Sequence, residues 1–164
     1  MTPPDINSAT FRHVLGHYAT GVCVVTALEE DQTPIGMVVG SFTSVSLNPP
    51  LIAFFPDQKS TSWPRIEKAG KFCVNVLAGD QHLLCRQFAT AGSEKFTGVA
   101  HRISNNGAPI LDDALAWIDC SLDDVHEFGD HYMALGRVDS LGVGRSCSPL
   151  LFFQGGYGEF TLHS

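Results

Sequence analysis

The amino-acid sequence predicts a mainly β fold, an antiparallel β-barrel with peripheral helices, formed as a single domain by residues 1–164. Several short segments rich in β-branched and aromatic residues follow one another along the chain, each bounded by glycine, proline or polar residues. Only two or three helical patterns interrupt them, without strict alternation of strand and helix, which favours a closed antiparallel sheet over a parallel one. The length of 164 residues also suits one domain.

The first predicted element is a helix over residues 8–18, which Gly21 is expected to end. Its apolar side chains recur at steps of three and four residues; they are Phe11, Val14, Leu15 and Tyr18. A second helix is expected to begin at Ser62, with the hydroxyl as N-cap and Pro64 in the first turn, and to end at Gly70. Asp80 is expected to cap a third helix. Strands are predicted over residues 22–27, 34–42, 51–55, 72–77, 115–122, 131–138, 150–154 and 157–162.

The composition predicts that part of the surface is covered. Apolar residues make up 44% of the chain and charged residues only 16%, against an average of about 25% charged. Ordinary solvated surface is therefore scarce, and we expect some apolar area to be covered by a ligand or by a second copy of the chain. The expected assembly is a homodimer.

The charge balance argues against nucleic acid as a partner. Ten basic and 17 acidic residues give a formal net charge of −7, so the overall field repels polyanions. Seven of the ten basic residues nevertheless fall between Lys59 and Arg102. A small anionic ligand could therefore find a positive pocket in the middle of the chain.

The cysteines and the N-terminal residues predict a cytoplasmic protein. The five cysteines form an odd set without a Cys-x-x-Cys pair, as expected of free thiols in a reducing compartment. The first residues lack the basic and apolar regions of an export signal. Residues 33–55 carry no charge, but their glycines and prolines would leave unsatisfied backbone groups in lipid, so no membrane segment is predicted.

Several catalytic and nucleotide-binding motifs are excluded. Gly142-Val143-Gly144 looks like the start of a dinucleotide fingerprint, but Cys147 stands in place of the third glycine and no βαβ unit surrounds it. Neither a Walker phosphate loop nor a serine nucleophile elbow occurs. His13 and His17 lie four residues apart but lack the glutamate of a zinc-protease motif, and no metal site is predicted.

Two segments could hold a phosphate-bearing ligand. Residues 36–50 combine two glycines, which allow close approach of a ligand, with hydroxyl side chains and an aromatic face. Lys59-Ser60-Thr61-Ser62 precedes the second helix, so hydroxyls and free backbone N–H groups meet at its start. The alternative is that these serines only cap strands and the helix. His131, beside Asp130 in a turn, is either solvated surface or a hydrogen-bonding partner for an amide or a phosphate.

Taken together, these segments resemble the flavin reductase-like family, the small reductase components of two-component flavin-dependent monooxygenases. The resemblance is specific because the motifs occur in the expected order over most of the chain. The motifs are residues 11–15 (FRHVL), 19–22 (ATGV), 41–51 (SFTSVSLNPPL), 60–61 (ST), 72–77 (FCVNVL), 88–89 (FA), 94–99 (EKFTGV), 114–120 (ALAWIDC), 129–131 (GDH) and 149–157 (PLLFFQGGY).

The resemblance implies a split β-barrel of the flavin reductase/FMN-binding type that forms a homodimer, binds FAD or FMN, and reduces it with NADH or NADPH. The reduced flavin would then pass to a separate oxygenase component. By position, the residues lining the flavin would be Val38, Val39, Gly40, Ser41 and Phe42, with Ser44, Ser46, Lys59, Ser60 and Thr61 around its phosphate. Lys95 and Phe96 would lie near the flavin or its adenylate part. The nicotinamide would be bordered by Gly129, Asp130, His131 and Tyr157, with His131 as the candidate catalytic residue. Val38 stands where the family often has threonine, so its contact is expected through the backbone only.

The resemblance also explains why no nucleophile or metal cluster is found, because hydride passes between the two cofactors themselves. Two other interpretations stay open. One is a non-enzymatic flavin-binding split barrel that acts as an electron carrier or sensor, and the other is a ligand-free barrel that acts through its dimer surface. Gel filtration separates the first from a reductase, because a carrier keeps its flavin and a reductase loses it.

Overall fold

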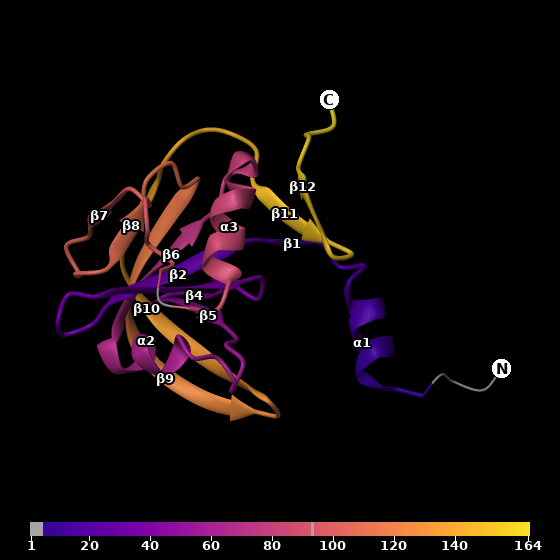
Figure 1. Cartoon of the computed structure of the whole chain (residues 1–164), viewed down its shortest axis with the longest axis horizontal. Coiled ribbons are helices and arrows are strands. Elements are labelled where there is room, and N and C mark those ends of the chain that lie inside the picture. Colours follow the sequence, from indigo (N-terminus) through magenta and orange to yellow (C-terminus); the bar gives the residue numbers. More distant parts are fainter. Residues whose placement is uncertain (1–4, 93) are drawn as a thin grey trace.

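The computed structural model describes residues 5–92 and 94–164 and is mainly β (Figure 1), which confirms the predicted class. In chain order the elements are α1 (Ser8–Leu15), β1 (Thr20–Gly21), β2 (Cys23–Leu28), β3 (Pro34–Val39), β4 (Thr43–Leu47), β5 (Pro50–Phe54), α2 (Trp63–Ala69), β6 (Lys71–Val76), the 3₁₀ turn η1 (Gly79–Gln81), α3 (His82–Ala89), β7 (His101–Ile103), β8 (Pro109–Leu111), β9 (Ala116–Phe128), β10 (His131–Val143), β11 (Leu150–Phe153) and β12 (Gly156–Glu159). Each predicted strand segment contains a strand, and β1, β4, β7 and β8 are additional. None of the helices within residues 5–92 and 94–164 combines the length and the apolar character of a membrane-spanning helix.

Seven strands form one antiparallel sheet in the order β3-β2-β6-β9-β10-β5-β4. β3 and β4 are the two ends of this sheet, yet only residues 40–42 connect them. A link of this length spans at most about 14 Å, so the sheet curls until its two ends approach each other at this corner. Among the described strands the hydrogen-bonded ladder ends at β3 and β4, so the predicted closed barrel is not confirmed.

The main hydrophobic core lies between the curled sheet and α2. Its largest fully buried side chains include Phe54 of β5, Trp63 of α2 and Phe72 of β6. The ring centroid of Phe54 lies 5.6 Å from that of Trp63 and 5.4 Å from that of Phe72, both edge to face. Because Trp63 is the first residue of α2, its burial also fixes the end of the loop that precedes this helix.

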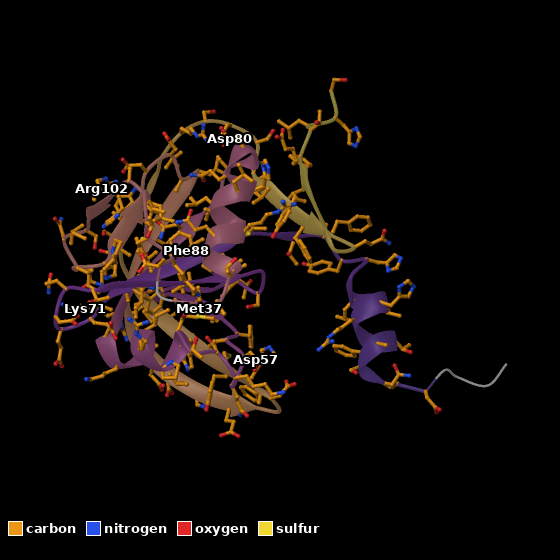
Figure 2. All side chains as sticks on the ribbon, in the orientation of Figure 1. Met37, Asp57, Lys71, Asp80, Phe88 and Arg102 are labelled. Atoms are coloured by element: carbon orange, nitrogen blue, oxygen red, sulfur yellow. The ribbon has the colours of Figure 1, made fainter. Side chains whose placement is uncertain are left out.

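A second apolar cluster joins α3 to β3. Phe88 of α3 is fully buried and lies near the middle of the molecule (Figure 2). Gly36 of β3 is directly opposite, since a Cβ added there would lie 2.6 Å from Cε1 of the Phe88 ring. Phe96 packs edge to face against Phe88, with ring centroids 5.0 Å apart. Only glycine therefore leaves room for the Phe88 ring at this point.

α1 lies at one side of the molecule, next to the three-stranded sheet β1-β11-β12, and stands apart from the body (Figure 1). The Thr10 N–H donates to Asn7 Oδ1 at 2.9 Å, which caps the start of the helix. Gly16 ends the helix, so the prediction that it continues to Tyr18 and is ended by Gly21 is wrong. Every residue of α1 is at least partly exposed, and its predicted apolar stripe lies on the surface.

The starts of α2 and α3 also differ from the sequence-based expectations. Ser62 occupies the predicted N-cap position, but its hydroxyl makes no capping hydrogen bond, and the Trp63 N–H donates to Ser60 Oγ at 3.1 Å. Asp80 lies inside η1 and pairs with Arg145, so it does not cap α3 directly. Both side chains bond to distant residues instead of capping a helix, since Ser62 Oγ accepts from Lys95 and Asp80 pairs with Arg145.

Four of the five cysteines are buried free thiols, and Cys147 is exposed. Burial raises the pKa of Cys23 and of Cys73 to about 12. These thiols therefore stay protonated near neutral pH and act as small apolar side chains.

Candidate functional site

The loop before α2 and the β9–β10 hairpin are held together by hydrogen bonds. Gln58 donates twice, from its backbone N–H to Asp130 O at 3.0 Å and from Nε2 to Gly129 O at 3.2 Å. Asp57 also forms an isolated antiparallel bridge with His131. The structure thus brings two groups of predicted site residues together, namely Lys59, Ser60 and Thr61 of the loop, and Gly129, Asp130 and His131 of the hairpin.

Asp130 and His131 form a hydrogen-bonded pair at the tip of the hairpin. Gly129 has a φ of +60°, a conformation that favours glycine and allows the tight turn. His131 Nδ1 lies 2.7 Å from Asp130 Oδ1. Because a carboxylate only accepts, Nδ1 carries the hydrogen, and Nε2 is the acceptor of the neutral ring. The His131 side chain is 42% exposed, so this oriented acceptor is accessible to a ligand.

The electrostatics of the hairpin tip follow from the same contacts. The hydrogen bond to His131 lowers the pKa of Asp130 below its ordinary value. Lys59 of the neighbouring loop adds a smaller effect in the same direction. Asp130 is therefore ionised near neutral pH and holds the imidazole in one orientation.

Asp57 fixes the turn that contains Lys59 and Ser60. The Lys59 N–H donates to Asp57 Oδ1 at 2.7 Å, and the Ser60 N–H donates to Asp57 O at 3.0 Å. Ser60 Oγ accepts from Trp63, and its own hydroxyl hydrogen can still be donated. The side-chain groups that this loop offers to an anion are the hydroxyls of Ser60 and Thr61 and the ammonium of Lys59, all at least partly exposed.

Ser44 and Ser46 lie on β4, the edge strand at one end of the sheet. The register of β4 against β5 shifts between these two serines, so Val45 forms a bulge. The outer backbone groups of an edge strand are available to a ligand. Ser41, in contrast, is engaged inside the protein, because its Oγ accepts from the Phe55 N–H at 2.9 Å.

An apolar pocket of about 280 Å³, called here the β3 pocket, opens beside the end of β3. Its lining residues are Thr20, Val22, Val38, Gly40, Cys85, Phe152 and Tyr157. Sites for whole small molecules span roughly 300–1,000 Å³, so this volume suits one ring system. Three predicted residues, Val38, Gly40 and Tyr157, therefore meet in one cavity. Val39 and Phe42 pack with the main core instead.

Tyr157 is fixed in this pocket by two contacts. The Cys85 thiol donates to the Tyr157 hydroxyl at 3.4 Å, and the Phe152 ring meets the Tyr157 ring at a centroid distance of 5.6 Å. The contact with Cys85 and burial raise the pKa of Tyr157 above its ordinary value. The side chain therefore stays a neutral phenol at physiological pH.

Lys95 and Phe96 have partners within the protein. Lys95 Nζ donates to Gly36 O at 3.2 Å and to Ser62 Oγ at 3.3 Å, so it connects β3 with the start of α2. Burial lowers the pKa of Lys95 below its ordinary value. The Phe96 ring packs against Phe88. A flavin contact by either residue stays a prediction, and both have a structural role.

The sequence patterns did not single out four residues of the β3 pocket, namely Thr20, Val22, Cys85 and Phe152. Thr20, Val22 and Phe152 occur in the motifs that carry the family resemblance, so their place in those motifs could have indicated them. Cys85 lies in a helical pattern and carries no such signal.

No metal site is assigned. Within residues 5–92 and 94–164, no group of three or more His, Cys, Asp or Glu side chains is placed to hold a metal ion. The rings of His13 and His17 lie 5.2 Å apart, and His17 Nδ1 is within 2.9 Å of the His13 carbonyl oxygen.

A mainly β fold with a ring-sized apolar pocket and nearby hydroxyl groups fits the class of small cofactor-binding proteins. Comparison with protein families makes the assignment specific. The model of the family described as "Flavin reductase like domain" matches residues 15–161, and the chain belongs to this family. The resemblance inferred from the motifs is therefore confirmed.

The chain is similar to members of this family over most of their length. It is 57% identical to a flavin reductase from Pseudomonas putida over 156 residues, which cover 95% of this chain and 92% of that protein. It is 47% identical to the flavin-dependent monooxygenase reductase subunit HsaB of Rhodococcus jostii, over 93% of this chain and 77% of that protein. The solved structure of the Streptomyces globisporus NADH:FAD oxidoreductase SgcE6 with NAD and FAD fragments is 31% identical, with a TM-score of 0.90 over 98% of this chain and 97% of that chain.

Proposed function

We propose that this protein is an NAD(P)H:flavin oxidoreductase, which reduces FAD or FMN with NADH or NADPH and releases the reduced flavin to an oxygenase component. The observation that carries the proposal is membership of the flavin reductase-like family across residues 15–161. The relative named as a monooxygenase reductase subunit supports transfer to an oxygenase. The relative solved with NAD and FAD fragments supports the use of both nucleotides.

The residues of this chain fit a flavin. The β3 pocket offers aromatic and aliphatic walls to the faces of a planar ring. The neighbouring edge strand β4 offers outer backbone groups to the polar rim of such a ring. The hydroxyls of Ser44, Ser46, Ser60 and Thr61 and the ammonium of Lys59 suit a phosphate group.

In this proposal the chain positions the two nucleotides, which supply the redox chemistry when bound. His131 Nε2 would accept a hydrogen bond from a carboxamide N–H of the nicotinamide, because the bond from Nδ1 to Asp130 fixes the orientation of the imidazole. The walls of the β3 pocket would exclude water from the bound ring. Such placement at a fixed distance is the contribution that a protein makes to a reaction between two bound molecules.

The test is the rate of NADH and NADPH oxidation by the purified protein, with and without added FAD or FMN. We expect oxidation that depends on added flavin, and a protein that elutes from gel filtration largely without flavin. No stimulation by either flavin with either nicotinamide nucleotide would contradict the proposal. A protein that elutes yellow and oxidises neither nucleotide would instead be a flavin-binding carrier or sensor.

The role of His131 is tested by H131A, with H126A as the matched control. His126 lies on the same hairpin and is also an exposed histidine paired with an aspartate, since its Nε2 lies 2.9 Å from Asp124 Oδ2. Loss of one hydrogen bond predicts a KM for NADH about five-fold higher in H131A. Equal KM values in wild type and H131A would show that His131 does not contact the nicotinamide.

We further propose that residues 1–164 form a single domain with a split β-barrel, and that two copies form a homodimer. The close approach of β3 and β4 at residues 40–42 supports the barrel. The exposed apolar stripe of α1, which includes Phe11 and Leu15, supports contact with a second copy. Light scattering should give the mass of a dimer for the wild type and of a monomer for F11D/L15D. A monomeric wild type would contradict the homodimer.

A further inference from the structure

A second pocket, of about 350 Å³, lies between α3 and β12 and is called here the α3–β12 pocket. Its lining residues are Gly79, His82, Arg86, Leu150, Tyr157, Gly158 and Glu159. Tyr157 lines both this pocket and the β3 pocket, so the two cavities adjoin at one side chain. Figure 1 shows α3 beside the β11–β12 hairpin.

The two walls of the α3–β12 pocket differ in charge. His82 and Arg86 lie four residues apart on α3 and therefore share one face of the helix. Tyr157 and Glu159 lie two residues apart on β12 and therefore share one face of the strand. The buried Leu150, whose Cα partner is Glu159, lies beneath them. A basic wall thus faces a wall that carries a phenol and a carboxylate.

Arg86 is available to a ligand. Within the described part of the chain, the arginines in ion pairs are Arg65, Arg137 and Arg145, and Arg86 is not among them. The Arg86 guanidinium carbon lies 6.0 Å from the centroid of the Tyr157 ring. This contact holds the guanidinium next to the junction of the two pockets. Its planar set of N–H donors matches the oxygens of a phosphate group.

Glu159 indicates that the ligand carries hydroxyl groups as well as an anion. Its side chain lies over Gly79, since a Cβ added to Gly79 would come within 2.9 Å of Glu159 Oε1. A carboxylate would repel a bare phosphate ion but accepts hydrogen bonds from hydroxyls. In nucleotide sites an acidic residue commonly binds the ribose in this way. Arg86 and Glu159 in one cavity therefore match a ribose phosphate.

We propose that the α3–β12 pocket binds the ribose phosphate part of a nucleotide, with Arg86 on the phosphate and Glu159 on a ribose hydroxyl. The inference rests on the proposed function, which requires a nicotinamide nucleotide and a flavin. NADH and the adenylate half of FAD both contain a ribose phosphate, whereas FMN has no adenylate. The two adjoining pockets, of about 280 and 350 Å³, together reach the size of a site for a whole ligand.

The test compares R86Q with R102Q. Arg102 is a matched control, because it is also exposed and also lies over an aromatic ring, that of Trp117, at 5.2 Å. Calorimetric titration with ADP-ribose measures binding without turnover. We expect R86Q to bind ADP-ribose about ten-fold more weakly than the wild type, as for the loss of a hydrogen bond to a charged group, and R102Q to bind within about two-fold. Equal unfolding midpoints of the two variants establish that R86Q is folded.

Steady-state kinetics identify which nucleotide uses the pocket. A KM for NADH about ten-fold higher in R86Q, with FMN as the flavin, assigns the pocket to the nicotinamide nucleotide. A rise confined to the KM for FAD assigns it to the flavin adenylate. Values within about two-fold of the wild type for ADP-ribose binding and for both KM values would overturn the inference. A wild type without flavin-dependent NADH oxidation would refute the proposed function alone, and the titration would still decide on the pocket.

Discussion

The close approach of Gly36 to Phe88 predicts that a single added methyl group destabilises the protein. In G36A the new Cβ would lie 2.6 Å from Cε1 and 2.8 Å from Cδ1 of the Phe88 ring. Apolar carbon atoms in contact are normally about 3.5–4.0 Å apart, so the ring would have to move by roughly 1 Å. Phe88 is fully buried and Phe96 packs against it, so this movement disturbs the whole cluster between α3 and β3.

The expected cost follows from the lack of free space. Overpacking of a filled core by one methyl group costs about 1–3 kcal/mol of the free energy of unfolding. For a protein of this size, that corresponds to a fall in Tm of roughly 3–10 °C. The measurement is urea unfolding, in which the midpoint should fall while the slope m stays the same.

G21A is the matched control, because Gly21 also lies in a strand and nothing lies within 4 Å of a Cβ added there. We expect G21A to be as stable as the wild type or slightly more stable, since alanine loses less chain entropy than glycine on folding. In G36A/F88L the smaller side chain should relieve the overlap, so the double variant should lose less than the sum of the single losses. Equal stabilities of G36A and wild type, or losses that simply add, would refute the packing argument.

K95M should lower the free energy of unfolding by about 1–2 kcal/mol, because it leaves Gly36 O and the buried Ser62 hydroxyl without the Lys95 ammonium. Urea unfolding checks this, and K71M at an exposed position is the control. D119N should become more stable relative to the wild type as the pH rises. Burial raises the pKa of Asp119, so its contribution to stability is present below the ordinary carboxyl pKa and is lost as the pH rises through the raised value. Unfolding at about pH 4 and pH 7 measures the difference, and a constant gap between the two proteins would contradict the assignment.

Local patterns identified most strands but placed the helix ends less well. Apolar periodicity continues to Tyr18, and this predicted a helix over residues 8–18 that Gly21 would end. In the structure Gly16 already ends α1, because the chain must turn there to enter β1. Periodicity reports which residues share a face, and a turn within a periodic segment leaves that signal unchanged.

Residues of the candidate site could be predicted from the sequence only where they belong to a family motif. The contact between Gln58 and Gly129 joins residues 71 positions apart, and local sequence carries no signal for such a pairing. Lys95 illustrates the opposite difficulty. Its place in a motif suggested a ligand contact, whereas the structure gives its ammonium two partners on β3 and at the start of α2. Arg86 belongs to none of the family motifs. In the sequence, only its spacing of four residues from His82 indicates that the two side chains share one face of α3 and line the same pocket.

The two ends of the seven-stranded sheet have consequences for the solubility of the protein without ligand. An unprotected edge strand can pair with the edge of another molecule and begin aggregation. At β3 the Lys95 ammonium occupies the Gly36 carbonyl, and at β4 the bulge at Val45 breaks the regular spacing that an added strand would need. Neither feature blocks a small molecule. The outer backbone groups of β4 therefore stay accessible to a cofactor, while pairing with a strand of another molecule is disfavoured.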